Sequence, residues 1–173
     1  MGVVHHQAAM YAAAAMTSSP VLRDALTFRP ATVGDLQQVV ALLQEDALGA
    51  TREDTTHLRR YEDAFRELDA DPNNTVYVAA RDGRVVGTLQ LTMIRNLTYT
   101  GGLRAQIEGV RSHRDARGQG VGRFMIEAAV EIAKARGAHL VQLTSNKARL
   151  KALEFYERMG FVATHEGFKR TLT

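Results

Sequence analysis

The sequence predicts an α/β (α+β) domain with a mixed central sheet, and three observations carry this prediction. Residues 104–143 read as strand, glycine-rich turn, helix and strand with tight joints, which indicates a right-handed βαβ unit with parallel strands. Residues 76–93 read as two strands about Asp82-Gly83, the pattern of an antiparallel hairpin. The chain has 173 residues, of which 45% are hydrophobic and 24% are charged. These values suit one globular domain with one sizeable core.

The N-terminal part of the domain predicts one strand and two helices. Residues 26–29 read as a short strand. Thr32 and Asp35 have the spacing of a capping box, and the apolar residues behind them recur at helical spacing. Thr51 and Asp54 offer a second capping box ahead of another helical run. The polar segment between the two helices is expected to be a solvated loop.

Residues 104–110 are expected to form the first strand of the βαβ unit. Because side chains alternate along a strand, Gln106, Glu108 and Val110 are expected on one face, and the residues between them on the other. Glu108 is therefore a carboxylate on a core strand, pointing with Val110.

The C-terminal third of the chain predicts two helices and three strands. The helix over 120–137 has apolar residues at helical spacing and ends at a glycine. A short buried strand over 140–143 completes the βαβ unit, and a helix over 150–159 follows it. Residues 161–163 and 168–172 are expected to form the last two strands of the sheet, paired through a turn.

The glycine-rich turn VRSHRDARGQGVG, residues 110–122, is a candidate anion site. The first N–H groups of a helix have no partners within it, and glycines let a phosphate approach the backbone closely. The turn is no P-loop, because Arg123-Phe124 stands where a Lys-Ser/Thr pair is needed, and it lacks the dinucleotide pattern GxGxxG. Four arginines surround it and would add charge-assisted bonds to phosphate oxygens: Arg111, Arg114, Arg117 and Arg123.

Composition and charge exclude several classes of protein. The net charge of +3 suits an anionic cofactor but forms no dense basic stripe, so no nucleic-acid partner is expected. The chain has no cysteine, which excludes disulfides, thiolate metal sites and a cysteine acyl-enzyme. No metal site, no membrane span and a cytoplasmic location are expected. Residues 1–25 are expected to form a flexible leader without a secretory signal, and residues 26–173 the domain.

Three motifs in order give the sequence a family resemblance. They are IEGV at 107–110, RGQGVG at 117–122 and FYERMGF at 155–161. Their content and spacing resemble the GNAT superfamily of N-acetyltransferases over residues 26–172. The resemblance implies the GNAT fold, a mixed sheet of about six to seven strands flanked by about four helices.

The resemblance also implies acetyl-CoA as co-substrate. Its diphosphate would rest on the loop Arg117, Gly118, Gln119, Gly120, Val121, Gly122 and Arg123. Its pantetheine arm would bond the backbone at Val110, Arg111 and Ser112 as an added strand would, with a β-bulge expected at Gly109. Many members carry asparagine at the position of Arg149, so Arg149 and Asn146, which lies earlier in the chain, are the two candidates for a further pantetheine contact.

Two residues are candidates for proton transfer. Glu108 matches a glutamate that some small-molecule members use as general base; the alternative is a structural carboxylate paired with Arg104 or Arg111. Tyr156 resembles the family's general acid, which protonates the departing thiolate; the alternative is a core tyrosine. The oxyanion would meet a backbone N–H near Val110 or Arg111.

The predicted function is acetyl transfer from acetyl-CoA to the primary amine of a small molecule. The absence of cysteine favours direct attack in a ternary complex. Two alternatives stay open: a protein N-terminus or lysine as the acceptor, and a non-catalytic acyl-CoA-binding module. A homodimer also stays open.

Overall fold

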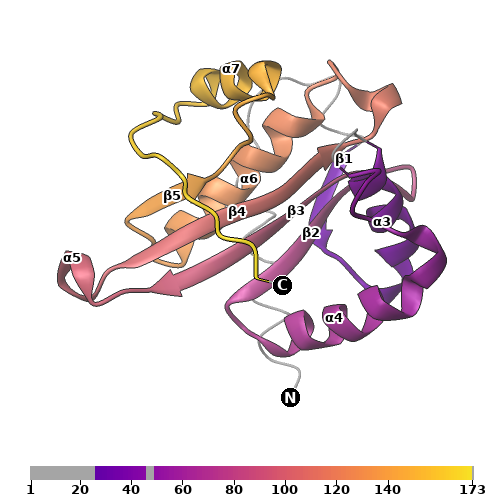
Figure 1. The fold of residues 1–173 in the computed structure, drawn as a ribbon, viewed down its shortest axis with the longest axis horizontal. Helices are drawn as coiled ribbons and strands as arrows, with labels where there is room; N and C mark the ends of the chain where they lie inside the picture. The colour runs from indigo at the N-terminus through magenta and orange to yellow at the C-terminus, as the bar shows by residue number, and fades with distance from the viewer. Residues whose placement is uncertain (1–25, 46–48, 173) are drawn as a thin grey trace.

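The computed structural model describes residues 26–45 and 49–172 (Figure 1). The expected leader, residues 1–25, lies outside the described residues. In chain order the elements are β1 (Leu26–Pro30), η1 (Val33–Asp35), α3 (Leu36–Gln44), η2 (Thr55–His57), α4 (Leu58–Ala70), β2 (Asn74–Arg81), β3 (Arg84–Arg95), α5 (Thr98–Gly101), β4 (Leu103–Ser112), η3 (Arg114–Ala116), α6 (Val121–Ala135), β5 (Leu140–Leu143) and α7 (Leu150–Arg158). Among these residues, no helix is both long and apolar enough to cross a bilayer.

The central sheet is mixed, which confirms the predicted fold class. Its strand order is β1-β2-β3-β4-β5. The first three pairs are antiparallel, whereas β4 and β5 are parallel and are joined by α6. The predicted hairpin is present: Asp82 and Gly83 both have positive φ, 51° and 78°, between β2 and β3. This is the backbone of a tight two-residue turn.

The sheet has fewer strands than expected. The described residues form five strands instead of about six to seven, because residues 161–163 and 168–172 form no strand. Their apolar residues Phe161, Val162, Phe168 and Leu172 are compatible with a strand, but a strand also needs an edge to pair with. In Figure 1 this segment runs from α7 across the projected strands toward the C label, and does not follow β5 as a sixth strand.

Helices cover the two faces of the sheet with separate hydrophobic clusters. On one face, α6 packs Met125, Ile126 and Ala129 against strand residues such as Ile107. On the other face, α3 and α4 pack against β2 and β3 around Leu36, Val39, Leu42, Phe65 and Val78. These two layers confirm the amphipathic pattern of the predicted helices.

The α3/α4 face becomes polar toward the later strands. The Asn74 side chain accepts from Gln90 Nε2 at 2.8 Å and from the Thr92 hydroxyl at 2.6 Å. Gln142 on β5 donates to Gln106 on β4 at 2.6 Å. Directly opposite residues share a face, and Gln90 lies opposite Glu108. Glu108 therefore belongs to this polar part of the sheet.

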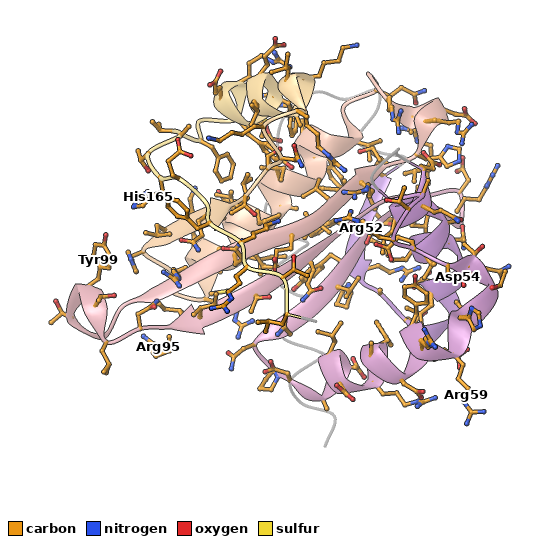
Figure 2. The ribbon with its side chains drawn as sticks, in the orientation of Figure 1. Arg52, Asp54, Arg59, Arg95, Tyr99 and His165 are labelled. Atoms are coloured by element: carbon orange, nitrogen blue, oxygen red, sulfur yellow. The ribbon has the colours of Figure 1, made fainter. Side chains whose placement is uncertain are left out.

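The start of α4 differs from the prediction. A 3-10 turn, η2, precedes the helix, and its N-cap is Asp54, whereas the N-cap of α4 itself is His57; Thr51 caps neither element. The Asp54 carboxylate accepts from the Thr56 N–H at 2.8 Å and from the Thr56 hydroxyl at 2.6 Å, and it lies 2.6 Å from His57 Nδ1. Figure 2 shows Asp54 at this end of the helix.

Asp35 fixes the first helix to the first strand. Its carboxylate accepts two bonds from the Arg29 guanidinium, at 2.7 and 2.9 Å, and two from Thr32, at 2.7 Å from the N–H and 2.8 Å from the hydroxyl. The Arg29 bonds, followed by those from Thr32, lower the pKa of Asp35 from 3.8 to about 2 although burial opposes this. Asp35 is 6% exposed, whereas the Arg29 side chain is 41% exposed, so the link between β1 and α3 is buried at its carboxylate end.

We expect Asp35→Asn to lower the free energy of unfolding by about 1–3 kcal/mol, because a charged acceptor of four bonds is lost. The folded pKa is below the unfolded value, so the wild-type carboxylate stabilises the fold above about pH 4 and this contribution is lost as the pH falls toward 2. Urea unfolding measured at several pH values should therefore show that the free energy of unfolding falls less at acid pH in the variant than in the wild type. Asp63→Asn, at an exposed i,i+3 pair on α4, is the control; an equal effect of both variants contradicts the prediction.

Candidate active site

The parallel strands β4 and β5 separate at their carboxyl ends. Their ladder runs only from Arg104 opposite Leu140 to Ile107 opposite Leu143. β5 ends there, whereas β4 continues to Ser112. Among the described residues, no strand therefore pairs with the β5 side of residues 108–112. This part of β4 can accept an extended ligand as if it were a neighbouring strand.

A β-bulge at Gly109 sets the direction of the side chains at this opening, as predicted. Gln90 lies opposite Glu108 and Thr88 lies opposite Arg111, so Gly109 and Val110 together face one residue of β3. Gly109 has a φ of +61°, a conformation that favours glycine.

The expected alternation through this bulge was wrong. Val110 packs with Ile107 against the α6 core, whereas Glu108 is exposed on the opposite face. The physical reason is the extra residue, which reverses the alternation of side chains after Glu108. As a result, Glu108 and Arg111 share the α3/α4 face, while Val110 anchors the strand in the core.

The glycine-rich loop leaves the first amides of α6 without backbone partners. Gly118 and Gly120 have φ values of +77° and +81°, and no atom lies within 4 Å of where a Cβ would stand on either. The first amide of α6 that donates to a backbone carbonyl is Phe124, which donates to Gly120 at 2.9 Å. In the described chain, the amides of Val121, Gly122 and Arg123 have no backbone acceptor. They are available to a phosphate at the helix N-terminus.

Three elements meet at Gly122. A Cβ placed there would lie 3.7 Å from the Ser112 hydroxyl at the end of β4 and 3.4 Å from the Phe155 ring on α7. The loop is held from the other side by Gln119, which accepts from Arg81 at 2.7 Å and donates to the Asp115 carbonyl at 2.7 Å. The opening of β4, the loop and α7 therefore form one continuous site.

Comparison with known proteins decides the family of this site. The profile of the acetyltransferase (GNAT) family matches residues 36–161. The chain belongs to the GNAT family. It is an acyltransferase, and acetyl-CoA is its acetyl donor.

Two relatives that are named as N-acetyltransferases agree with this assignment. An aminoalkylphosphonate N-acetyltransferase of Salmonella typhimurium is 31% identical over 144 residues, which cover 83% of this chain and 90% of the relative. A glucosamine 6-phosphate N-acetyltransferase of Trypanosoma brucei brucei is 37% identical over 84 residues, 49% of this chain and 54% of the relative. A crystal structure described as a transcriptional regulator from Bacillus halodurans C-125 is 48% identical with a TM-score of 0.82, covering 85% of this chain and 99% of that chain.

Tyr156 of the GNAT motif FYERMGF lies among aromatic and cationic side chains. Its ring contacts Phe155 and Phe161 with centroid separations of 5.2 and 6.0 Å. Burial raises the pKa of the Tyr156 hydroxyl above its usual 10, and the charges of Arg111 and Arg149 oppose this rise. Tyr156 therefore holds its proton at neutral pH and lies near two cations.

The two candidates for a further pantetheine contact have different local roles. The side-chain oxygen of Asn146 accepts from the Ala148 N–H at 2.9 Å, which leaves its amide NH2 as the group able to reach a ligand. Arg149 caps the N-terminus of α7 and interacts electrostatically with Tyr156.

Glu108 is exposed, and its side chain makes no ion pair within the described residues. Within the described residues, no salt bridge or hydrogen bond joins it to Arg104 or Arg111. Arg111 instead donates to the Val110 carbonyl at 2.9 Å.

No group of three or more His, Asp or Glu side chains in the described ranges could hold a metal ion.

The structure adds Glu45, which the sequence patterns did not indicate. This residue follows α3, and its side chain is 11% exposed. Its carboxylate accepts from the Arg114 N–H at 3.0 Å, and it lies 3.5 Å from the Arg117 guanidinium and 3.4 Å from His113 Nε2. Glu45 therefore connects α3 to the start of the glycine-rich loop. No local motif predicts a contact between residues this far apart in the chain.

We expect Glu45→Ala to weaken acetyl-CoA binding about tenfold, because the loop loses a charged acceptor worth about 1–2 kcal/mol. Glu45→Gln keeps an oxygen for the Arg114 N–H and should give a smaller loss. Calorimetric titration at fixed salt measures the effect. Glu67→Ala, an exposed glutamate on α4, is the matched control; unchanged affinity in Glu45→Ala contradicts the assigned role.

Proposed function

We propose that the protein acetylates the primary amine of a small molecule by direct attack on acetyl-CoA in a ternary complex. The proposal rests mainly on the separation of β4 from β5 next to a loop whose amides have no backbone acceptor. Glu108, the last residue before the bulge, is exposed at this opening. The loop supplies a site for the diphosphate, and residues 108–112 supply an edge for the pantetheine arm.

Glu108 is the proposed general base. Most amines are protonated at neutral pH, and only the free amine attacks a thioester, so a carboxylate near the reacting nitrogen must take the proton. Glu108 is exposed on the polar α3/α4 face, where side chains can form hydrogen bonds with a polar amine substrate. The glycine-rich loop follows the end of the same strand.

Tyr156 is the proposed general acid. When the bond between the acetyl carbon and sulfur breaks, the leaving thiolate needs a proton, and a phenol that stays protonated can donate it. The raised pKa of Tyr156 keeps that proton available, and the nearby positive charges of Arg111 and Arg149 stabilise negative charge that develops on sulfur or on the phenolate. A backbone N–H at Val110 or Arg111 is the proposed partner of the oxyanion.

The proposed acceptors are primary amines that also carry a phosphonate or phosphate group. The names of two relatives specify such acceptors, an aminoalkylphosphonate and glucosamine 6-phosphate. Arg104 lies on the same face of β4 as Gln106 and Glu108, and its side chain makes no hydrogen bond or ion pair within the described residues. A cation without a partner on this face suits an anionic acceptor.

The alternative is a non-catalytic acyl-CoA-binding module. The observation in its favour is the 48% identity to a solved protein described as a transcriptional regulator. A protein acceptor is a further alternative for the same chemistry.

An acceptor panel with thiol release as the readout tests these functions. The panel contains 2-aminoethylphosphonate and glucosamine 6-phosphate, their uncharged counterparts ethanolamine and glucosamine, and peptides with a free N-terminus or lysine. We expect turnover with the first two and at least tenfold lower kcat/KM with their counterparts. Binding of acetyl-CoA without turnover of any amine would support the binding module, and turnover of peptides alone would support a protein acceptor.

A further inference from the structure

Arg81 connects the far end of β2 to the glycine-rich loop. It is the last residue of that strand. Its neighbour Ala80 lies opposite Val85, which packs in the α3/α4 cluster. Because successive side chains of a strand alternate, Arg81 points to the other face of the sheet, where α6 packs. There its Nη1 donates to the Oε1 atom of Gln119 at 2.7 Å.

Gln119 carries this contact into the loop. While its Oε1 accepts from Arg81, its Nε2 donates to the Asp115 carbonyl at 2.7 Å. On either side of Gln119 stand Gly118 and Gly120, with φ values of +77° and +81°. Glycines restrict their own backbone least of all residues, so the shape of the loop has to be held by other contacts. The amide of Gln119 supplies two of them, one to the sheet and one within the turn.

The rest of the Arg81 guanidinium is poorly satisfied. Its Nε and Nη2 atoms are buried and have no hydrogen-bond partner within the described residues. In the same part of the chain, no carboxylate forms an ion pair with it. Burying part of a cation without a counter-charge opposes folding. Stability of the fold therefore gives little reason for an arginine at this position.

We propose that Arg81 is a positioning residue for acetyl-CoA, which acts through Gln119 to hold the glycine-rich loop in the shape that receives the diphosphate. This inference rests on the proposed placement of the diphosphate on the loop. A bond from a cationic donor is stronger than one from a neutral donor, so Arg81 fixes the Gln119 side chain firmly. A loop that already has its bound shape loses less conformational entropy when the ligand binds.

Calorimetric titration of the full-length protein with acetyl-CoA at fixed salt tests this role. Arg81→Met keeps an unbranched side chain but removes the donor and the charge, and we expect a dissociation constant about tenfold higher. Arg81→Lys keeps a donor and the charge and should recover most of the affinity. Arg84→Met is the matched control, because Arg84 is exposed and lies opposite Arg81 on β3. Equal affinity of Arg81→Met and Arg84→Met would overturn the proposal.

A double-mutant cycle with Gln119→Met tests whether Arg81 acts through Gln119. If the two side chains work as one unit, the double variant binds acetyl-CoA no more weakly than the weaker single variant. Losses that multiply in the double variant would mean that Arg81 acts on the ligand independently of Gln119, which contradicts the positioning role.

Urea unfolding without ligand separates positioning from a general structural role. Since two guanidinium nitrogens are buried without partners, Arg81→Met should unfold at a urea concentration no lower than the wild type. A clearly lower midpoint would make Arg81 a structural residue of the fold and overturn the proposal.

Turnover assays separate this inference from the proposed function. Arg81→Met should raise the KM for acetyl-CoA about tenfold and leave kcat within about twofold. A lower kcat with an unchanged KM would contradict the positioning role. A wild-type protein that binds acetyl-CoA but acetylates no amine would instead contradict the proposed acetyl transfer, and the titrations would still decide the role of Arg81.

Discussion

Glu108→Gln is expected to lower kcat/KM for the amine about 10²–10³-fold while acetyl-CoA binding stays within about twofold, as loss of a general base predicts. The amide keeps the size and polarity of the side chain but takes no proton from the attacking amine. Since a higher pH supplies more free amine, the deficit of the variant should shrink as the pH rises. Thiol release measured from neutral to alkaline pH, together with calorimetric titration of acetyl-CoA, checks both expectations.

Glu157→Gln is the matched control for this variant. Glu157 is an exposed glutamate next to Tyr156 in the motif FYERMGF, and the same chemical change there should leave turnover unchanged. Wild-type kcat/KM in Glu108→Gln would remove the assignment of Glu108 as base. A loss that does not shrink at alkaline pH would indicate a role in binding the acceptor.

Tyr156→Phe is expected to lower kcat about 10–10²-fold with little change in KM, because the leaving thiolate loses its proton donor. The ring contacts with Phe155 and Phe161 are retained, so the free energy of unfolding should change by less than about 1 kcal/mol. Burial raises the pKa of Tyr156 above 10. The wild-type kcat should therefore show no alkaline decline from this group below about pH 10.

Rapid-quench or steady-state assays of Tyr156→Phe should be paired with Tyr99→Phe, a tyrosine 73% exposed beside β4. The control should retain wild-type kcat. If Tyr156→Phe retains it too, Tyr156 is a core residue and the departing thiolate is protonated by solvent.

The parts of this protein that the sequence predicts are those determined by neighbouring residues. Asp82-Gly83 determines a turn locally, and the glycines at 118 and 120 adopt the backbone that their loop requires. The helices follow from periodicity for the same reason. All seven loop residues from Arg117 to Arg123 come together because they are consecutive in the chain.

The parts that could not be predicted depend on distant contacts. Glu45 meets Arg114 across 69 positions of the sequence, and no local pattern encodes that contact. The C-terminal segment has the composition of a strand, but whether it pairs depends on an edge supplied elsewhere. The position of the bulge at Gly109 was predicted correctly. The face on which Val110 lies was not, because it depends on how many residues of β4 oppose each residue of β3.

That same bulge makes the length of β4 as important as its composition. Gly109 is the extra residue that reverses the alternation of side chains along the strand. Val110 therefore points into the core, and Arg111 lies on the opposite face, only while Gly109 is present. Deleting Gly109 would move every later side chain of β4 to the other face of the sheet, so that Val110 would lie on the face of Glu108 and the Arg111 guanidinium would point into the hydrophobic core. Evolution can therefore exchange side chains along this strand far more easily than it can insert or remove a single position.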